Sequence, residues 1–247
     1  MLVAARSAGL GQLRSYLVAD LLRRYSERRR LTPTVIDLLP GHEAELRAAC
    51  AELNIHPPRH TLTLPVTTEQ LAGQFADGIR EPVFDVGVRA AGEPAEPTAE
   101  GLAAVWIEVA GAGNGAADGG KTTSRERLEL GSEPAAVRLN LMRHGYGETL
   151  GSGPQPGAME ADSARKELAR WRELVAGWAR SPSGAMSRRY ADAVTTAFED
   201  DLNTAMALRE MAALADDTEV PDGVKFETFA AADRLFGLDL ARDVGQY

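Results

Sequence analysis

Residues Gly9–Tyr25 have the sequence GLGQLRSYLVADLLRRY, and the rest of the predicted fold is organised around this stretch. Two glycines open it, and a helical pattern follows in which Leu13, Leu17 and Leu21 recur every four residues. Met1–Ala5, MLVAA, comes before it and has the composition of a short buried strand. A strand, a glycine turn and a helix start often hold nucleotide phosphates, because glycine lets the backbone approach a ligand and the helix N–H groups attract an anion. The pattern alone is weak evidence, since most such turns hold no ligand.

Composition bounds the class of protein. The 247 residues are 44% hydrophobic and 26% charged, which fits one large globular domain or two modest ones. The sequence has neither a long apolar run nor the pattern of a secretory signal, so we expect a cytoplasmic protein with no membrane contact. The net charge of −9 repels phosphate backbones. Nucleic acid is therefore not an expected partner.

Two local features each have a functional and a structural interpretation. Five arginines lie in Arg23–Arg30 and resemble a basic patch, but cations are also favoured at a helix C-terminus, so a solvated helix end is the preferred interpretation. Cys50, the single cysteine, falls on an apolar helix face. A buried structural thiol is preferred there over a nucleophile.

The chain in order predicts an α/β part followed by helices. Strands are expected where β-branched and apolar residues cluster, and helices where apolar residues recur every three to four positions. Pro65 places the third strand at a sheet edge or in a loop. The predicted strands are 1–5, 34–39, 61–66, 83–88 and 102–109, and the predicted helices 9–25, 42–53, 67–77, 133–143, 161–180, 187–198, 204–214 and 224–236.

These elements predict two domains. Residues 1–144 form a shortened α/β domain with a parallel sheet, in which the Gly/Ala/Pro-rich region 90–120 is flexible apart from its strand. Residues 145–160 are a linker, and 161–247 form a helical bundle.

Several colinear segments resemble the cysteinyl-tRNA synthetase family and its relative, the cysteine ligase of mycothiol biosynthesis. The segment Asp200–Leu208, DDLNTAMAL, is similar to the helix start in the family's C-terminal bundle, and Phe236–Leu240, FGLDL, to the end of that bundle. Arg14–Tyr25 resembles the helix after the family's first signature, Glu52–Pro58 a segment between strands, and Ala135–Leu139 the helix after the second signature. The resemblance implies a reduced Rossmann-like (HUP-type) sheet of the class I aminoacyl-tRNA synthetase kind, with ATP as the candidate ligand.

The family's first signature, His-apolar-Gly-His, falls on Gly9-Leu10-Gly11-Gln12. Both histidines, which stabilise charge on the ATP phosphates, are replaced by a glycine and a neutral amide. Gly11, the position where the adenine ring packs, is kept. The resemblance therefore implies a nucleotide site around Gly9, Gly11 and Gln12 with weakened catalysis.

The second signature, Lys-Met-Ser-Lys-Ser, is nearest to Lys121–Arg125, KTTSR. Lys121 occupies the position of the first lysine of the signature, and Ser124 occupies the position of the second lysine. These two residues are therefore candidate phosphate contacts. A solvated charged loop is the alternative interpretation.

The family's cysteine-selecting zinc needs ligands that this chain does not carry at the matching places. The first strand has no cysteine, the ligand-bearing segment between Val88 and Val105 is short, and His42, His56, His60 and His144 have no metal-site spacing. We expect no zinc, and His56 and His60 as surface or capping groups.

Two functions of different classes follow. The first is a cysteinyl-tRNA synthetase-like protein that has lost adenylation and acts as a binding, regulatory or scaffold subunit. The second is an ATP-dependent ligase that joins an amino acid or amine other than cysteine. The chain ends where a tRNA synthetase would continue, and Trp171 and Trp178 suit helix packing better than base stacking, so tRNA is not expected. A shortened sheet leaves an edge to cover, which predicts a homodimer or a partner protein.

Overall fold

The computed structural model describes residues 1–4, 10–38, 43–62, 84–91, 103–110, 133–150 and 156–246. It is a mixed α/β protein that divides into two compact units. Unit 1 contains residues 1–129 and 146–152, and unit 2 contains residues 130–145 and 153–247.

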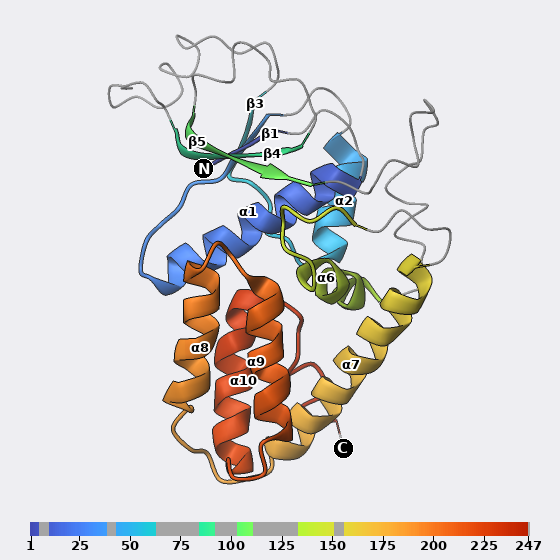
Figure 1. Ribbon diagram of the computed structural model, residues 1–247, viewed down its shortest axis with the longest axis vertical. Helices are drawn as coiled ribbons and strands as arrows, with labels where there is room; N and C mark the ends of the chain where they lie inside the picture. Colours follow the sequence, from blue (N-terminus) through green and yellow to red (C-terminus); the bar gives the residue numbers. More distant parts are fainter. Residues whose placement is uncertain are drawn as a thin grey trace. The chain divides into compact units, whose positions relative to one another are not determined.

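Unit 1 is built on a parallel sheet. Its described strands lie in the order β3-β2-β1-β4-β5, and every neighbouring pair is parallel. Figure 1 shows the strands together with the helices α1 and α2. The elements are β1 (Leu2–Ala4), α1 (Leu10–Arg28), β2 (Ile36–Leu38), α2 (Glu43–Glu52), β3 (His60–Leu62), β4 (Phe84–Ala90) and β5 (Ala103–Val109).

The register of the sheet decides which side chains face α1 and α2. Val3 lies opposite Asp37 on one side and Val88 on the other, so these residues share a face. Tyr16 of α1 donates a hydrogen bond to Asp37, which identifies this face as the one that α1 covers. Val3 and Val88 are fully buried there and form the core of the unit with the leucines of α1.

Unit 2 is helical. It contains α6 (Pro134–Met142), α7 (Pro156–Trp178), α8 (Arg188–Glu199), α9 (Thr204–Asp216) and α10 (Asp222–Phe236), and α8, α9 and α10 lie side by side (Figure 1). Pro134 begins α6 at the position where its missing N–H costs nothing. The Asn203 side chain caps α9 by accepting a hydrogen bond from Met206 N–H, and Gly237 ends α10 in the left-handed conformation at φ 66°.

The core of unit 2 is aromatic. Trp171 and Phe229 are fully buried and meet edge to face with ring centroids 5.8 Å apart, while Trp178 meets Phe229 at 5.2 Å. This confirms that both tryptophans pack within the bundle.

Several sequence-based boundaries need correction. The helix predicted to open with a turn at Gly9–Gly11 already includes Gly11 as its second residue, and it continues to Arg28 because the arginines after Tyr25 suit a helix C-terminus. The predicted linker 145–160 ends early, since α7 begins at Pro156, where proline is well placed in a first helical turn.

The predicted domain boundary after residue 144 also differs from the two units. Residues 130–145, which include α6, belong to unit 2, because Arg138 and Thr204 tie α6 to the other helices. Residues 146–152 return to unit 1. The predicted helix 67–77, Pro65, and the parts 92–102 and 111–120 of the region predicted to be flexible lie outside the described residues.

Candidate functional site

The carboxyl ends of the parallel strands come together where α1 starts. Ala4, the last residue of β1, lies beside Arg89 of β4 on one side and Leu38 of β2 on the other. Helix α1 begins six residues after Ala4, at Leu10. Its 19 residues give it a full macrodipole, and its first N–H groups have no partners within the helix.

The predicted site residues are only partly described. Gly9, Lys121 and Ser124 lie outside the described residues. Gly11 is half-buried in the first turn of α1, and its carbonyl accepts a hydrogen bond from Ser15 Oγ at 3.0 Å. Gln12 is buried, with 5% of its surface exposed.

Arg14 also lies near the start of α1, although the sequence did not predict it as a site residue. Its side chain is 1% exposed, and Nη1 donates to the carbonyl of Ala110 at 2.7 Å and to the carbonyl of Glu148. Ala110 N–H in turn donates to Tyr146 O at 2.8 Å. Burial lowers the pKa of the guanidinium, and the Glu148 carboxylate acts in the opposite direction. Arg14 therefore fixes the end of β5 and residues 146–148 against the first half of α1.

A second polar cluster surrounds Asp37 in the middle of β2. Its carboxyl group is 1% exposed, Oδ2 accepts a hydrogen bond from Tyr16 Oη at 3.4 Å and lies 3.9 Å from Arg47 Nη2, and Oδ1 has no hydrogen-bond partner within the described residues. Burial raises the pKa of Asp37 above its ordinary value. This effect is larger than the lowering of the pKa by the hydrogen bond with Thr61 and by the charge of Arg47. The group retains its proton at a higher pH than an exposed aspartate does.

Cys50 adjoins this cluster. The thiol is buried, as predicted, and burial together with the charges of Asp20 and Asp37 raises its pKa to about 12. A thiol that stays protonated is a poor nucleophile, which supports the structural interpretation.

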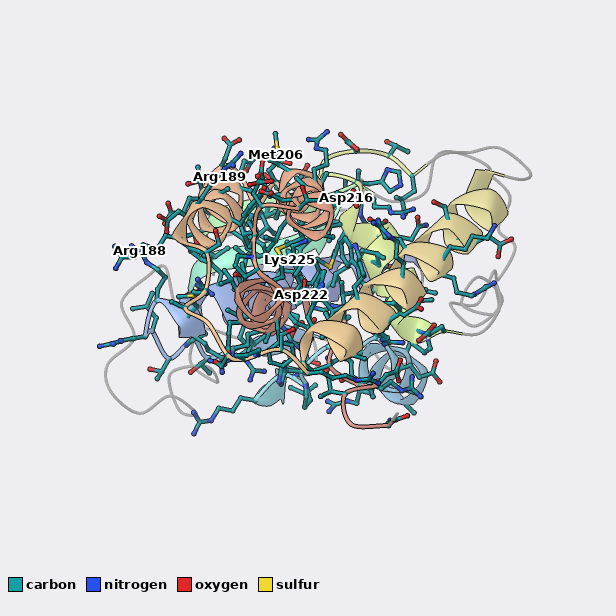
Figure 2. All side chains as sticks on the ribbon, turned by 90° about the horizontal axis from the view of Figure 1, so that it is seen from below. Arg188, Arg189, Met206, Asp216, Asp222 and Lys225 are labelled. Carbon is teal, nitrogen blue, oxygen red and sulfur yellow. The ribbon has the colours of Figure 1, made fainter. Side chains whose placement is uncertain are left out.

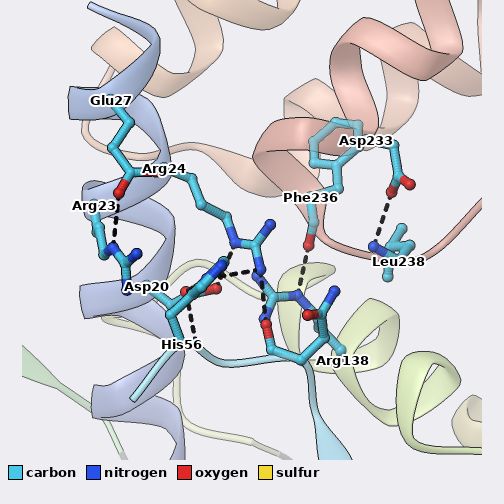
Figure 3. A network of polar contacts seen from close by, with 10 residues as sticks. Asp20, Arg23, Arg24, Glu27, His56, Arg138, Asp233, Phe236 and Leu238 are labelled. Atoms are coloured by element: carbon cyan, nitrogen blue, oxygen red, sulfur yellow. Dashed lines mark hydrogen bonds and ion pairs between the residues drawn. The ribbon is translucent and has the colours of Figure 1, made fainter. Parts of the chain in front are cut away.

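The network in Figure 3 joins α1 to the segment after α2. Asp20 accepts a hydrogen bond from Arg24 Nε at 2.7 Å and from the His56 backbone N–H at 3.1 Å, while Arg24 also donates to the carbonyl of Asn54. The His56 ring lies 3.0 Å from Asp20 through Nδ1. His56 is exposed, which fits the surface alternative predicted for it, and it contacts the middle of α1 and not a helix end. Arg23 pairs with Glu27 on the exposed side of the same helix.

Unit 2 carries a groove of about 1230 Å³ along α7. Arg172 is one of its lining residues and donates to the carbonyls of Leu238 and Asp239 and to the Glu133 carboxylate. Charges of both signs line the groove in equal number. They are Arg170, Arg172, Arg180, Arg242, Glu133, Glu173, Asp222 and Asp243.

Lys225 is the buried amine of unit 2 (Figure 2) and is 7% exposed. Its Nζ donates to the carbonyl of Ala215 at 3.1 Å and lies 5.3 Å from the centre of the Trp178 ring. Ala215 is near the end of α9, where a cation complements the helix dipole. Lys225 is explained as a helix cap with a cation–π contact.

In the part of the chain that the structure describes, no three His, Cys, Asp or Glu side chains gather as a metal site, and the absence of zinc stays a prediction. None of the described helices is both long enough and apolar enough to span a bilayer. Comparison of the sequence with protein family models and with curated proteins finds no match.

Proposed function

We propose that this chain is a Rossmann-like (HUP-type) nucleotide-binding protein, a degenerate relative of the cysteinyl-tRNA synthetase and mycothiol cysteine ligase family. In this proposal it binds ATP at the carboxyl edge of its sheet and acts as a binding or regulatory subunit that does not adenylate cysteine. The observation that carries the proposal is the strand order β3-β2-β1-β4-β5.

That order runs outward from β1 in two directions. The chain first builds β2 and β3 on one side of β1, and then crosses back to build β4 and β5 on the other. In open parallel sheets, ligands bind beyond the carboxyl ends of the strands at such a reversal, because the connections there leave in opposite directions. The N-terminus of α1 follows β1 at that point and favours an anionic group such as a phosphate.

The loss of adenylation follows from the residues at the signature positions. A glycine and a glutamine stand where the related ligases have histidines, and neither side chain supplies a cation. Gln12 is also 5% exposed. Charge that develops on ATP during attack by a carboxylate would therefore lack its main stabilising donors.

Isothermal titration calorimetry with ATP tests whether the chain binds ATP. A matched pair of variants tests whether ATP binds at the N-terminus of α1. Gly11→Asp places a carboxylate in the first turn of α1, where it suits the helix dipole but repels phosphate, and circular dichroism checks that the variant is folded. Leu31→Asp adds the same charge at a residue that is 62% exposed beyond the other end of α1. We expect the wild type and Leu31→Asp to bind ATP and Gly11→Asp to bind at least tenfold more weakly; absence of binding at millimolar ATP would remove the proposal.

An assay of ATP–pyrophosphate exchange distinguishes a binding or regulatory subunit from the alternative, an ATP-dependent ligase. We expect ATP to bind without amino-acid-dependent or amine-dependent exchange. Robust exchange with any amino acid or amine would instead favour the ATP-dependent ligase, with Lys121 and Ser124 as the first residues to substitute.

A further inference from the structure

Arg14 lies one turn inside α1, close to the end of the helix at which a phosphate is proposed to bind. It comes four residues after Leu10, the first residue of α1, which corresponds to about 6 Å along the helix axis. Side chains of a helix tilt toward its N-terminus, so Arg14 extends toward the first turn. Arg14 is 1% exposed, and its guanidinium is therefore held inside unit 1.

The contacts of Arg14 lie at the carboxyl end of the sheet. Nη1 donates to the carbonyl of Ala110, which directly follows β5, and to the carbonyl of Glu148. Ala91, which directly follows β4, donates its N–H to the carbonyl of Val109, the last residue of β5. Arg14 thus connects the start of α1 with the edge of the sheet at which these parallel strands end.

The positive charge of Arg14 is unusual at this end of a helix. Cations are favoured near a helix C-terminus and not near its N-terminus, and the first turn of α1 contains no acidic residue. The two carbonyl acceptors are neutral, so these hydrogen bonds leave the charge of the guanidinium in place.

The surroundings of Arg14 act on its charge in opposite directions. Burial lowers the pKa of the guanidinium, and the carboxylate of the exposed Glu148 acts to raise it. A guanidinium stays protonated in proteins despite such effects. An anion at the N-terminus of α1 would therefore interact favourably with both the helix dipole and the charge of Arg14.

We propose that Arg14 makes the nucleotide site selective for phosphate groups. In the proposed ATP site, on which this inference rests, Arg14 supplies a positive charge that the side chains at the signature positions lack. Its distance from the first residue of α1 is less than the Debye length of about 8 Å at physiological ionic strength, so dissolved ions screen the charge only in part. Arg14 is a positioning residue, because its hydrogen bonds go to carbonyls of the chain.

Isothermal titration calorimetry with adenosine, AMP, ADP and ATP tests this role. We expect the affinity of the wild type to rise with the number of phosphates. Arg14→Gln still offers a donor to the carbonyls but removes the charge, so it should weaken binding of ATP by at least about tenfold and binding of ADP and AMP progressively less. Arg14→Lys keeps the charge and should retain most of the affinity for ATP.

Arg138→Met is the matched control. Arg138 is also fully buried and donates to a main-chain carbonyl, but it lies in unit 2, so this variant should bind ATP as the wild type does. Circular dichroism checks that each variant is folded, and Arg14→Met replaces Arg14→Gln if the glutamine variant does not fold.

Three results would overturn the role of Arg14. They are unchanged ATP binding by the neutral variant, an equal loss for ATP, ADP and AMP, which would indicate a purely structural role, and a wild type that binds adenosine as tightly as ATP.

Titration with inorganic triphosphate separates this role from the proposed function. Binding of triphosphate that depends on the charge of Arg14, without binding of ATP, would remove the nucleotide proposal and support the phosphate selectivity. Absence of binding of both ligands at millimolar concentration would overturn both.

Discussion

Arg138 on α6 donates a hydrogen bond from Nε to the main-chain carbonyl of Phe236, 98 residues further along the chain (Figure 3). The guanidinium is fully buried, and its acceptor is the last residue of α10, where unpaired carbonyls carry the negative end of the helix dipole. Arg14 in unit 1 and Arg172 in unit 2 are buried in the same way and also donate to carbonyls. Buried arginines thus join distant segments within each unit.

Arg138→Met should destabilise unit 2 by about 2–4 kcal/mol, because it leaves a buried carbonyl without a donor and fills the site with a differently shaped side chain. Arg209→Met, at an exposed position on α9, is the control and should change stability by no more than about 0.5 kcal/mol. Urea unfolding followed by tryptophan fluorescence measures both. Equal effects of the two substitutions would show that the contact does not stabilise the unit.

Gly87 lies directly beneath the Trp106 ring. A Cβ atom at Gly87 would come within 2.5 Å of that ring, so Gly87→Ala should destabilise unit 1 by about 1–3 kcal/mol. The loss should shrink when Gly87→Ala is combined with Trp106→Ala, since the small side chain removes the clash. A double-mutant cycle by chemical denaturation measures this coupling, and additive losses would contradict it.

Asp37 should make unit 1 less stable as the pH rises. Its pKa is higher in the folded chain than in the unfolded chain, so the folded state binds the proton more tightly. The resulting stabilisation is complete below the unfolded pKa, near 3.9, and is lost as the pH rises through the folded pKa.

Asp37→Asn, which retains the shape without the charge, should therefore be more stable than the wild type at pH 7 and lose that advantage toward pH 4. Glu52→Gln, the same kind of substitution at an exposed position on α2, is the matched control. Thermal melts across this range make the comparison. A wild-type protein that matches Asp37→Asn at every pH would show that the folded pKa is not raised.

Cys50 should resist thiol reagents. The rise of its pKa from 9.0 to about 12 cuts the thiolate fraction at pH 8 by roughly a thousandfold, and burial also blocks access. Modification by a disulfide reagent should be very slow in the native protein and fast in urea. Rapid modification without denaturant would instead indicate a reactive thiol.

Much of the fold could be predicted from local patterns. The four-residue repeat of leucines after Gly11 predicted α1, and Val and Ile in the segments 34–39 and 102–109 predicted β2 and β5. Pro65 predicted an edge strand or a loop for the third strand; Pro65 itself lies outside the described residues, and among the described strands β3 pairs with β2 alone and lies at the end of the strand order. These features depend on residues close together in sequence, which is why the sequence shows them.

The polar contacts were harder to predict because they join distant residues. Arg14 meets a carbonyl 134 residues away, and Asp37 meets Tyr16 from another element. No local spacing marks an arginine or aspartate as buried, since these residues are usually exposed. The assignment of α6 to unit 2 was missed for the same reason, because its partner Phe236 lies near the other end of the chain.

In the proposed function, a nucleotide binds where the strand order reverses beside β1. The most direct measurement is a crystal structure of the full chain with ATP or a non-hydrolysable analogue. We expect phosphate density at the N-terminus of α1, next to Gly11 and beyond the carboxyl ends of β1 and β4. Nucleotide density in the groove along α7, or no bound nucleotide at millimolar ATP, would contradict it.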